Sequence, residues 1–423
     1  MLDLKFIREN PDMIRKAIEL KNAPCDLDKL LQLDAQVLDL KRKIENLQAS
    51  KNANAKQVAQ AKSEERASLI ENGKKIGTDI EQIKPQLQEA EAELKNLLWL
   101  VPNIPSEKAP IGKDDSENVE IKRWGNIPQF NFSPLDHVQI LEKHNWADLE
   151  RIANVCGSRT YCLKGDMVLL EMAILNFALA KLVEKKFTLI TVPALAREAA
   201  LYGTGHFPTG KDQVYHLPED NLYLSGTAEV PVNSLHSGET LTEAQLPMLY
   251  GGYSPCFRRE AGSAGRDVRG LIRVHQFMKV EQYIICKNDP EESAYWHMQL
   301  LQTAEELMQD LELPYRIVEC CTGDMGLGKV RMFDIEGWVP SEGKYRETHS
   351  CSSLHDWQAR RTNLRYRDKD GVMQFCHTLN NTAIATPRIL VPFLENHQQQ
   401  DGSIFVPEKL RKYLNDRVYL GKQ

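Results

Sequence analysis

Residues 257–283 read FRREAGSAGRDVRGLIRVHQFMKVEQY, and this stretch decides how the rest of the chain is interpreted. A short apolar and aromatic run ends in an Arg-Arg-Glu cluster, and a segment rich in Gly, Ala and Arg follows it. A second run with β-strand composition then carries its own Arg, His, Phe and Glu. The pattern predicts two β-strands joined by a cationic loop.

Strand periodicity sorts the side chains of this stretch onto faces, because successive residues of a strand point to opposite sides. One face of the second strand would carry Arg273, His275, Phe277, Lys279, Glu281 and Tyr283. On the first strand, Arg258 and Glu260 share a face. Such a surface is suited to hold a planar base on Phe277, phosphate on Arg258 and an amine on Glu281. A hairpin with cross-strand ion pairs explains the same pattern equally well.

Composition excludes some classes of protein. The chain has 423 residues, a net charge of -6 and 42% hydrophobic residues, and no run approaches the length of a membrane span. The N-terminus carries four acidic residues, which is unlike a signal or transit peptide; they are Asp3, Glu9, Asp12 and Glu19. Nine cysteines occur without a CxxC pair, which favours reduced thiols in a cytoplasmic location over a zinc cluster.

The N-terminal quarter contains two heptad seams, typical of a coiled coil. The first seam consists of Leu30, Leu33, Val37, Leu40, Ile44 and Leu47, and the second of Ile76, Ile80, Ile83, Leu87, Ala90, Leu94 and Leu97. Two seams with a short break predict an antiparallel helical hairpin over about 27–100, with its tip within 60–73, where Ser63, Glu71, Asn72 and Gly73 offer turn chemistry. Pro85 predicts a kink or a local 3₁₀ turn in the second helix.

Charge is distributed unevenly along this hairpin. Residues 41–75 hold nine Lys or Arg against four Asp or Glu, whereas 28–40 and 76–100 together hold three against eight. A basic far half is what contact with a phosphate backbone requires, although a solvated coiled-coil surface explains it too. The proline-rich run WLVPNIPSEKAP, residues 99–110, then reads as a linker. Beyond it, helical stretches alternate with short β-rich runs, which predicts an α+β body on a mainly antiparallel sheet flanked by helices.

The quoted stretch resembles motif 2 of the class II aminoacyl-tRNA synthetases, in which FRxE, a loop and RxxxF follow one another. Other segments are similar to the seryl-tRNA synthetase family in its bacterial and organellar form, nearly throughout the chain and in order. They are MLDLKFIRENPD, LLWLVPNIP, LSGTAEVP, YRETHSCSSLHDWQARR and TLNNTAIATPRILVPFLENHQQQDG. The resemblance implies that residues 1–105 form an N-terminal tRNA-binding domain and 106–423 a class II catalytic domain. Motifs 1, 2 and 3 would lie around 169–195, 253–285 and 378–399.

The resemblance also implies a reaction: L-serine and ATP give seryl-adenylate, and serine then passes to the 3′ end of tRNA(Ser). Some members of the family also transfer serine to tRNA(Sec). It implies Mg²⁺ as the cofactor and a homodimer as the working form, with Pro193 of motif 1 at the dimer interface. Arg258 would bridge the α-phosphate and the serine carboxylate, and Arg388 would hold the γ-phosphate; these two are the expected catalytic residues.

Further roles follow from the resemblance, residue by residue. Serine would be contacted by Thr227, Ala228, Glu229, Glu281, Asn380 and Thr382. Here Thr227 and Glu229 are expected on one strand face. ATP would be contacted by Arg258, Arg259, Glu260, Val274, Phe277, Glu347, Thr348, His349, Ser350 and Arg388. Metal ligands would be Glu347 and Ser350, whose spacing of three requires a bulge or a strand end before both can face one site. tRNA would be contacted by Lys41, Arg42, Lys51, Lys56, Lys62 and Arg66.

The motif 3 segment departs from the common bacterial pattern. Asn381, Ala383 and Pro387 stand where that pattern has glycine, and Thr382 keeps a hydroxyl. Thr386 and Pro387 are expected as the N-cap and first-turn proline of the next helix, and Pro392 would remove a hydrogen bond to the Arg388 carbonyl. His349 replaces a more usual Ser. The loop of motif 2 is expected to cover ATP, with Arg266 and Arg269 ordering when ligands bind.

Two other functions fit parts of the sequence. A related ligase could load an amino acid onto a carrier protein, but such relatives lack the long basic arm. A catalytically silent tRNA-binding paralogue is the second alternative, and the intact charged residues of all three motifs speak against it. A synthetase for a different amino acid fits the arm poorly.

Overall fold

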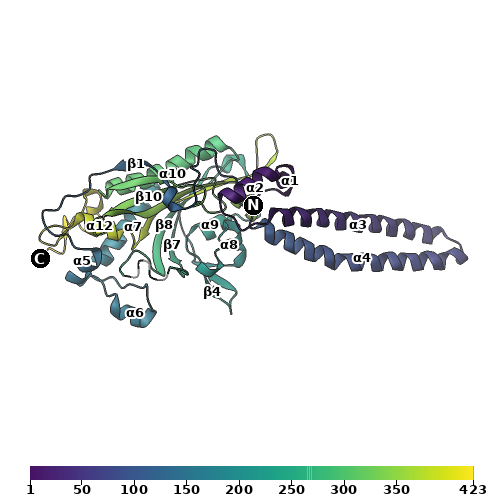
Figure 1. Ribbon diagram of the computed structural model, residues 1–423, viewed down its shortest axis with the longest axis horizontal. Coiled ribbons are helices and arrows are strands. Elements are labelled where there is room, and N and C mark those ends of the chain that lie inside the picture. Colours follow the sequence, from purple (N-terminus) through teal and green to yellow (C-terminus); the bar gives the residue numbers. More distant parts are fainter. Residues whose placement is uncertain (264, 266, 268, 423) are drawn as a thin grey trace. The chain divides into compact units, whose positions relative to one another are not determined.

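We describe a computed structural model of the chain at residues 1–263, 265, 267 and 269–422 (Figure 1). The chain divides into two compact units. One comprises residues 2–19 and 23–102, and the other comprises Met1, residues 20–22 and the described residues from Asn103 onward. Among the described residues, no helix combines the length and apolar character needed to cross a membrane.

The first unit is helical. It contains α1 (Leu4–Glu9), α2 (Pro11–Leu20), α3 (Leu27–Gln60) and α4 (Ser63–Leu98). Asp26 caps α3 by accepting a hydrogen bond from the Lys29 backbone N–H at 3.0 Å. The two long helices lie side by side and antiparallel, and Ala61 and Lys62 connect them (Figure 1). The predicted two-helix coiled-coil arm is therefore confirmed.

The seam between α3 and α4 contains the predicted side chains. All thirteen seam residues are buried or half-buried, and burial is most complete toward the base, as at Leu30 and Leu94. The prediction of turn chemistry at Glu71, Asn72 and Gly73 is wrong, because all three lie inside α4. Gly73 instead permits close packing: a Cβ there would lie 2.8 Å from the side-chain nitrogen of Asn54 on α3. Of the kink or local 3₁₀ turn expected at Pro85, the 3₁₀ turn is absent, since α4 remains α-helical through Pro85.

The second unit is built on an eight-stranded sheet in the order β1-β9-β10-β11-β14-β8-β7-β2. Every neighbouring pair is antiparallel except β2 and β7, which are parallel. The strands are β1 (Val119–Trp124), β2 (Thr188–Thr191), β7 (Met248–Phe257), β8 (Gln276–Cys286), β9 (Tyr315–Glu319), β10 (Arg331–Val339), β11 (Lys344–His355) and β14 (His377–Thr386). The predicted α+β class with a mainly antiparallel sheet is confirmed.

Helices cover both faces of this sheet (Figure 1). Alternate residues of β8 show the division: Val280 and Ile284 join the main core, whereas Tyr283 and Ile285 join a second apolar cluster on the opposite face. The main core includes side chains from α7 (Asp166–Glu184), α10 (Pro290–Asp310) and α12 (Leu390–His397). The second cluster includes side chains from α9 (Glu229–Leu235) and α11 (Trp357–Thr362).

Smaller elements complete the second unit. The short helices are α5 (His137–Lys143), α6 (Glu150–Cys156), α8 (Glu198–Thr204) and α13 (Glu408–Arg411), with 3₁₀ turns at Asp115–Glu117, Lys211–Gln213 and Glu243–Gln245. Three small sheets contain β3 (Leu195–Ala196), β4 (Tyr215–Leu217) and β5 (Leu222–Leu224); β6 (Thr240–Thr242), β12 (Arg365–Arg367) and β13 (Met373–Phe375); and β15 (Ile404–Phe405) and β16 (Tyr419–Leu420). All nine cysteines are free thiols.

Candidate active site

The site begins where β7 ends and β8 begins. The two strands pair from Met248 opposite Ile285 to Phe257 opposite Gln276. Arg258 follows β7 and extends the pairing, because its N–H donates to the His275 carbonyl at 2.9 Å. Glu260 has a φ of +52° and turns the chain into the loop. The expectation that Arg258 and Glu260 occupy a strand face is therefore wrong, yet both side chains line the same cavity.

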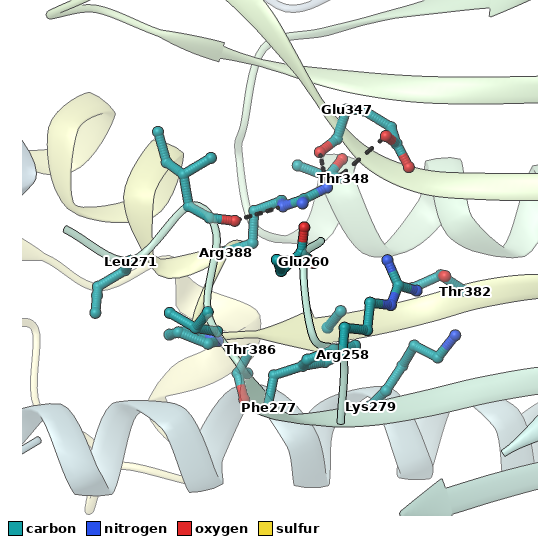
Figure 2. A pocket seen from close by; sticks show the side chains of 14 residues that line it. Arg258, Glu260, Leu271, Phe277, Lys279, Glu347, Thr348, Thr382, Thr386 and Arg388 are labelled. Atoms are coloured by element: carbon teal, nitrogen blue, oxygen red, sulfur yellow. Dashed lines mark hydrogen bonds and ion pairs between the residues drawn. The ribbon is translucent and has the colours of Figure 1, made fainter. Parts of the chain in front are cut away.

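This first cavity holds most of the residues expected to contact ATP (Figure 2). It is lined by Arg258, Glu260, Val274, Phe277, Glu347, Thr348 and Arg388, among others. The guanidinium carbon of Arg258 lies 5.2 Å from the centre of the Phe277 ring. A cation and an aromatic ring on one side of a cavity suit a ligand that combines phosphate with a flat base.

Backbone carbonyls hold Arg388 in this cavity (Figure 2). Its Nε donates to the Ile272 carbonyl at 3.0 Å, one Nη donates to the Glu347 carbonyl at 3.2 Å, and the Glu347 carboxylate lies 3.8 Å away. Burial lowers the pKa of Arg388, although arginine remains a cation at any ordinary pH. The head group is thus fixed in place, which favours binding of an anion.

A second cavity adjoins the first. It is lined by Thr204, His206, Thr227, Glu229, Glu281, Ser350, Asn380 and the loop residues 326–329, among others. Arg258, Lys279, Glu347 and Thr382 line both cavities, so the two are parts of one continuous site. The site therefore has a cation-rich end beside Phe277 and an end with buried carboxylates beside Thr227.

Burial raises the pKa of Glu281 and also that of Glu229. The Lys279 ammonium counteracts the effect at Glu281, since its Nζ lies 2.6 Å from that carboxylate. Glu229 accepts hydrogen bonds from Gln358 Nε2 at 2.6 Å and from Asn380 Nδ2 at 3.0 Å. Two carboxylates that repel each other in a confined space favour a cationic ligand between them.

A bulge in β11 brings Glu347 and Ser350 to the same cavity. In the pairing with β10, Ile335 lies opposite His349 and Glu336 opposite Glu347, so Thr348 is the extra residue. Because of that extra residue, two side chains three positions apart both line the second cavity. The bulge that Glu347 and Ser350 need in order to face one site is therefore present.

Three residues expected at the site do not line either cavity. Ala228 is fully buried in an apolar cluster, and Arg259 is exposed to solvent. His349 is buried, with Nε2 2.9 Å from the Ala383 carbonyl oxygen and Nδ1 2.8 Å from the Thr348 hydroxyl oxygen. Burial lowers the pKa of His349 to about 4, so the ring is neutral. Arg266 lies outside the described residues, and Arg269 pairs with Glu142 at 3.3 Å.

The segment predicted to contact serine is not a strand. Thr227 and Glu229 were expected on one strand face, but β5 ends at Leu224 and Glu229 begins helix α9. Thr227 instead lies next to the helix start, where its hydroxyl oxygen accepts the Glu229 N–H at 3.3 Å. Helical geometry is what directs the Glu229 carboxylate toward Asn380 and Gln358.

The motif 3 segment also differs from expectation. Thr386 is the last residue of β14 and not an N-cap, and its hydroxyl donates to Glu171 Oε1 at 2.7 Å. Helix α12 starts at Leu390, so Pro392 lies in its first turn, where its missing N–H is tolerated. The Arg388 carbonyl accepts the Val391 N–H at 3.1 Å. The side chain of Asn381, in place of glycine, is buried and donates to the Leu300 carbonyl at 2.9 Å.

Comparison with known proteins identifies the family. A family model described as the seryl-tRNA synthetase N-terminal domain matches residues 1–105, and one described as the tRNA synthetase class II core domain (G, H, P, S and T) matches residues 214–397. The serine–tRNA ligase of Deinococcus radiodurans is 58% identical, and the match covers 100% of this chain and 99% of that protein. The chain belongs to the seryl-tRNA synthetase family. It is an aminoacyl-tRNA synthetase, a serine–tRNA ligase.

Solved structures agree with this assignment. The seryl-tRNA synthetase of Pyrococcus horikoshii complexed with ATP matches with a TM-score of 0.91 and 38% identity, covering 98% of each chain. The cytoplasmic serine–tRNA ligase of Naegleria fowleri in complex with AMP matches with a TM-score of 0.87 and 28% identity, covering 99% of this chain and 98% of that one.

Several side chains of this synthetase site were not predicted from the sequence. Lys279 was placed on the correct face but given no role, although it pairs with Glu281. His206, Gln358 and the loop 326–329 were not predicted at all. The glycines of GLGK were the only signal for that loop, because close approach of backbone to a ligand often requires glycine.

The cations expected to contact tRNA all lie on the helical hairpin and are exposed. Lys41 Nζ forms an ion pair with Glu91 at 2.8 Å. The others belong to the far half of the hairpin or to the connection between its helices; they are Arg42, Lys51, Lys56, Lys62 and Arg66.

Proposed function

We propose that the two connected cavities divide the ligase reaction between them, ATP occupying the end at Phe277 and serine the end at Glu281. The observation that carries this proposal is that Arg258, Lys279, Glu347 and Thr382 line both cavities. A substrate at each end would therefore meet the other beside Arg258. Positioning of two reactants in this way can supply a large part of the rate enhancement.

At the ATP end, the adenine ring stacks on Phe277, and Glu260 accepts a hydrogen bond from the base. Glu260 is held for this role, because Arg273 Nη1 donates to its carboxylate at 2.6 Å. Val274 and Thr348 supply the remaining walls. Arg388 binds the γ-phosphate, and its two carbonyl contacts support a fixed orientation.

In the first step, a serine carboxylate oxygen bonds to the α-phosphorus as the bond to the β-phosphate oxygen breaks and pyrophosphate leaves. Arg258 contacts the α-phosphate and the attacking carboxylate together. It neutralises the charge that gathers there, which is electrostatic catalysis and not proton transfer. In the second step, a hydroxyl at the 3′ end of tRNA attacks the serine carbonyl carbon, and AMP leaves.

At the serine end, the ammonium group lies between Glu229 and Glu281, and Thr227 and Thr382 face the substrate hydroxyl. The raised pKa values of the two carboxylates support this arrangement, because a bound cation would remove the repulsion between them. Asn380 orients Glu229 by its hydrogen bond. Serine is thereby distinguished from alanine by the hydrogen bonds of its hydroxyl.

Glu347 and Ser350 fit a Mg²⁺ ion. A carboxylate and a hydroxyl are hard oxygen ligands, and the bulge at Thr348 turns both to the second cavity. When bound, the ion would neutralise phosphate charge and polarise the leaving group. The contribution of the chain is to hold the two oxygen ligands beside Arg388, whose Nη1 lies 3.8 Å from the Glu347 carboxylate.

We also propose that the working form is a homodimer. Helix α7 and strand β2 of motif 1 expose apolar side chains next to Pro193, which supports a protein interface there. They are Val168, Leu169, Met172, Val183 and Leu189, exposed by 39%, 46%, 55%, 53% and 38%.

The second partner is tRNA(Ser). Residues 1–105 form the tRNA-binding domain, residues 106–423 the catalytic domain, and the basic far half of the hairpin contacts the phosphate backbone through Lys51, Lys56 and their neighbours. tRNA(Sec) is a further substrate if it shares the recognised shape. The nine free thiols support a cytoplasmic location.

Serine-dependent exchange of pyrophosphate into ATP tests the proposal directly. We expect exchange with serine and not with alanine or threonine, and aminoacylation only when tRNA(Ser) is present. Exchange that is equally rapid with threonine would contradict the assignment of the serine end. Exchange without aminoacylation of any tRNA would contradict the assignment of the hairpin.

A further inference from the structure

The loop 326–329 forms one wall of the serine end of the site. Gly326, Leu327, Gly328 and Lys329 all line the second cavity, and none of them lines the first. The loop connects β9 to β10 and belongs to no helix or strand. Its conformation must therefore be fixed by contacts other than a regular backbone ladder.

Two residues supply those contacts. Lys21 Nζ donates to the carbonyls of Gly326 at 3.3 Å and Leu327 at 3.1 Å, and also to the carbonyl of Lys329. Asn103 donates from its backbone N–H to the Leu327 carbonyl at 2.8 Å and from Nδ2 to the Gly328 carbonyl at 3.1 Å. All four carbonyls of the loop therefore accept a hydrogen bond from one of these two residues.

Lys21 is placed unusually for a lysine. It follows helix α2 but belongs to the same compact unit as the eight-stranded sheet, and it is only 4% exposed. Among the described residues, no carboxylate forms an ion pair with it, and burial together with the Lys329 ammonium lowers its pKa to about 7. A buried charge met only by carbonyl oxygens is costly, so stability alone does not explain it.

The loop is confined on a second side by Trp357. A Cβ at Gly328 would lie 2.5 Å from a carbon of the Trp357 ring, so backbone and ring are in close contact. The loop thus contacts this ring as well as the donors of Lys21 and Asn103. From that position the Lys329 ammonium partly offsets the effect of burial, which raises the pKa of Glu229.

We infer that Lys21, a residue outside all three class II motifs, is a positioning residue that sets the serine end of the site by holding the loop 326–329. The inference rests on the proposed division of the two cavities between ATP and serine. Because the loop lines only the serine end, loss of the Lys21 donors should change serine binding and leave ATP binding nearly unchanged. Loss of a residue with a merely structural role would change the KM for serine and the KM for ATP alike.

The test compares Lys21→Met, which keeps the length but removes the donors, with Lys21→Arg, which keeps donors and charge. Lys16→Met on the exposed side of α2 is the matched control. Pyrophosphate exchange is measured at varied serine and at varied ATP, with active sites titrated and melting temperatures recorded. We expect Lys21→Met to raise the KM for serine about tenfold, with the KM for ATP within about twofold, and Lys21→Arg to restore much of the loss.

An unchanged KM for serine in folded Lys21→Met, or equal rises in both KM values, would overturn the inference. If Lys21→Met does not fold, Lys21→Gln carries the test: its side chain is shorter and uncharged and has only two N–H donors for the three carbonyls, so the KM for serine should still rise more than the KM for ATP. Failure of the proposed function looks different: the unmodified protein would then show no serine-dependent exchange. The effect of Lys21 is judged only against a wild type that exchanges.

Discussion

The two compact units of the chain differ in how many charges they bury. The helical hairpin keeps most of its charges in solvent, as in the pair of Lys29 and Glu93, whose side chains are 51% and 45% exposed. The unit that holds the two cavities, called the catalytic unit below, also has exposed charges, but it buries several, among them Lys21, Lys279, Glu281 and Asp334, each less than 9% exposed. Buried charge is therefore a feature of the catalytic unit more than of the hairpin.

This difference corresponds to two kinds of recognition. Exposed cations act on a polyanion through many weak contacts that salt screens, so no single one is decisive. A buried charge interacts strongly with its neighbours, and removal of one partner leaves the others unpaired. Variants of the hairpin should thus act on tRNA, additively and with salt dependence, and variants of the catalytic unit should act singly on serine or ATP.

The largest effect should come from shortening the hairpin. Deleting residues 47–60 and 63–76 removes two heptads from each helix and keeps the Ala61–Lys62 connection, so the seam stays in register. Since the reaction with ATP needs none of these residues, we expect pyrophosphate exchange to be unchanged and aminoacylation to be lost. Both are measured on one preparation, and loss of exchange as well would contradict the separation of the two units.

Arg258→Ala should have the next largest effect. The arginine lines both cavities and is proposed to neutralise the charge that develops at the α-phosphate. We expect kcat for exchange to fall about 10³-fold, the size of effect typical for removal of one donor to a developing oxyanion. Arg367→Ala on β12, which removes an exposed guanidinium far from motif 2 in sequence, is the control. A fall in kcat below tenfold would count against the role.

The sequence predicted the hairpin closely because its fold depends on local spacing. Leu30 to Leu97 follow a heptad pattern, and each of these side chains needs only its neighbours and one partner helix to be buried. The failure at Gly73 concerns a position where close packing of two helices replaces a turn signal. Residues 257–283 were likewise predicted as two strands, and only their ends differ.

The site was predicted in part, because its residues come from segments far apart in the chain. Phe277 and Glu281 followed from strand alternation, and the need for a bulge between Glu347 and Ser350 followed from their spacing. The start of helix α9 at Glu229 and the burial of His349 did not follow from the sequence, because tertiary packing decides both. Lys21 and the loop 326–329 meet only in the folded chain, so no local pattern could have joined them.

Glu281→Gln should raise the KM for serine about 100-fold and change its pH dependence. The carboxylate must be ionised to bind an ammonium group, and burial raises its pKa. A raised pKa means that the carboxylate takes up a proton at a higher pH than an ordinary glutamate, so in the wild type the KM for serine should rise as the pH is lowered. Exchange kinetics measured over a series of falling pH values check the prediction.

The amide of Glu281→Gln has no such titration, so much of this acid-side rise should disappear, with Glu229 accounting for the rest. Glu219→Gln makes the same chemical change at an exposed turn and should leave the profile as in the wild type. A wild-type KM for serine that does not change with pH would show that neither carboxylate binds the ammonium group.

Thr382→Ala should have a smaller effect, confined to serine. Thr382 is 9% exposed and lines both cavities, and its hydroxyl is proposed to face the substrate hydroxyl. Loss of one hydrogen bond is worth about 1 kcal/mol, so we expect the KM for serine to rise by about 5- to 10-fold. Thr382→Ser should restore the wild-type KM for serine. A KM for serine in Thr382→Ala equal to that of the wild type would contradict the proposed role of the hydroxyl.

The smallest effect should come from a single cation of the hairpin. Lys56→Ala removes one exposed ammonium group from α3, so we expect the KM for tRNA to rise only about twofold at moderate salt. Its signature is the salt dependence: if Lys56 contacts a phosphate, the slope of log KM against log salt should decrease by about 0.7–0.9. Lys29→Ala, in the acidic base of the hairpin, should leave that slope unchanged. A large, salt-independent loss at Lys56 would mean that the hairpin, like the catalytic unit, recognises its ligand through one decisive contact.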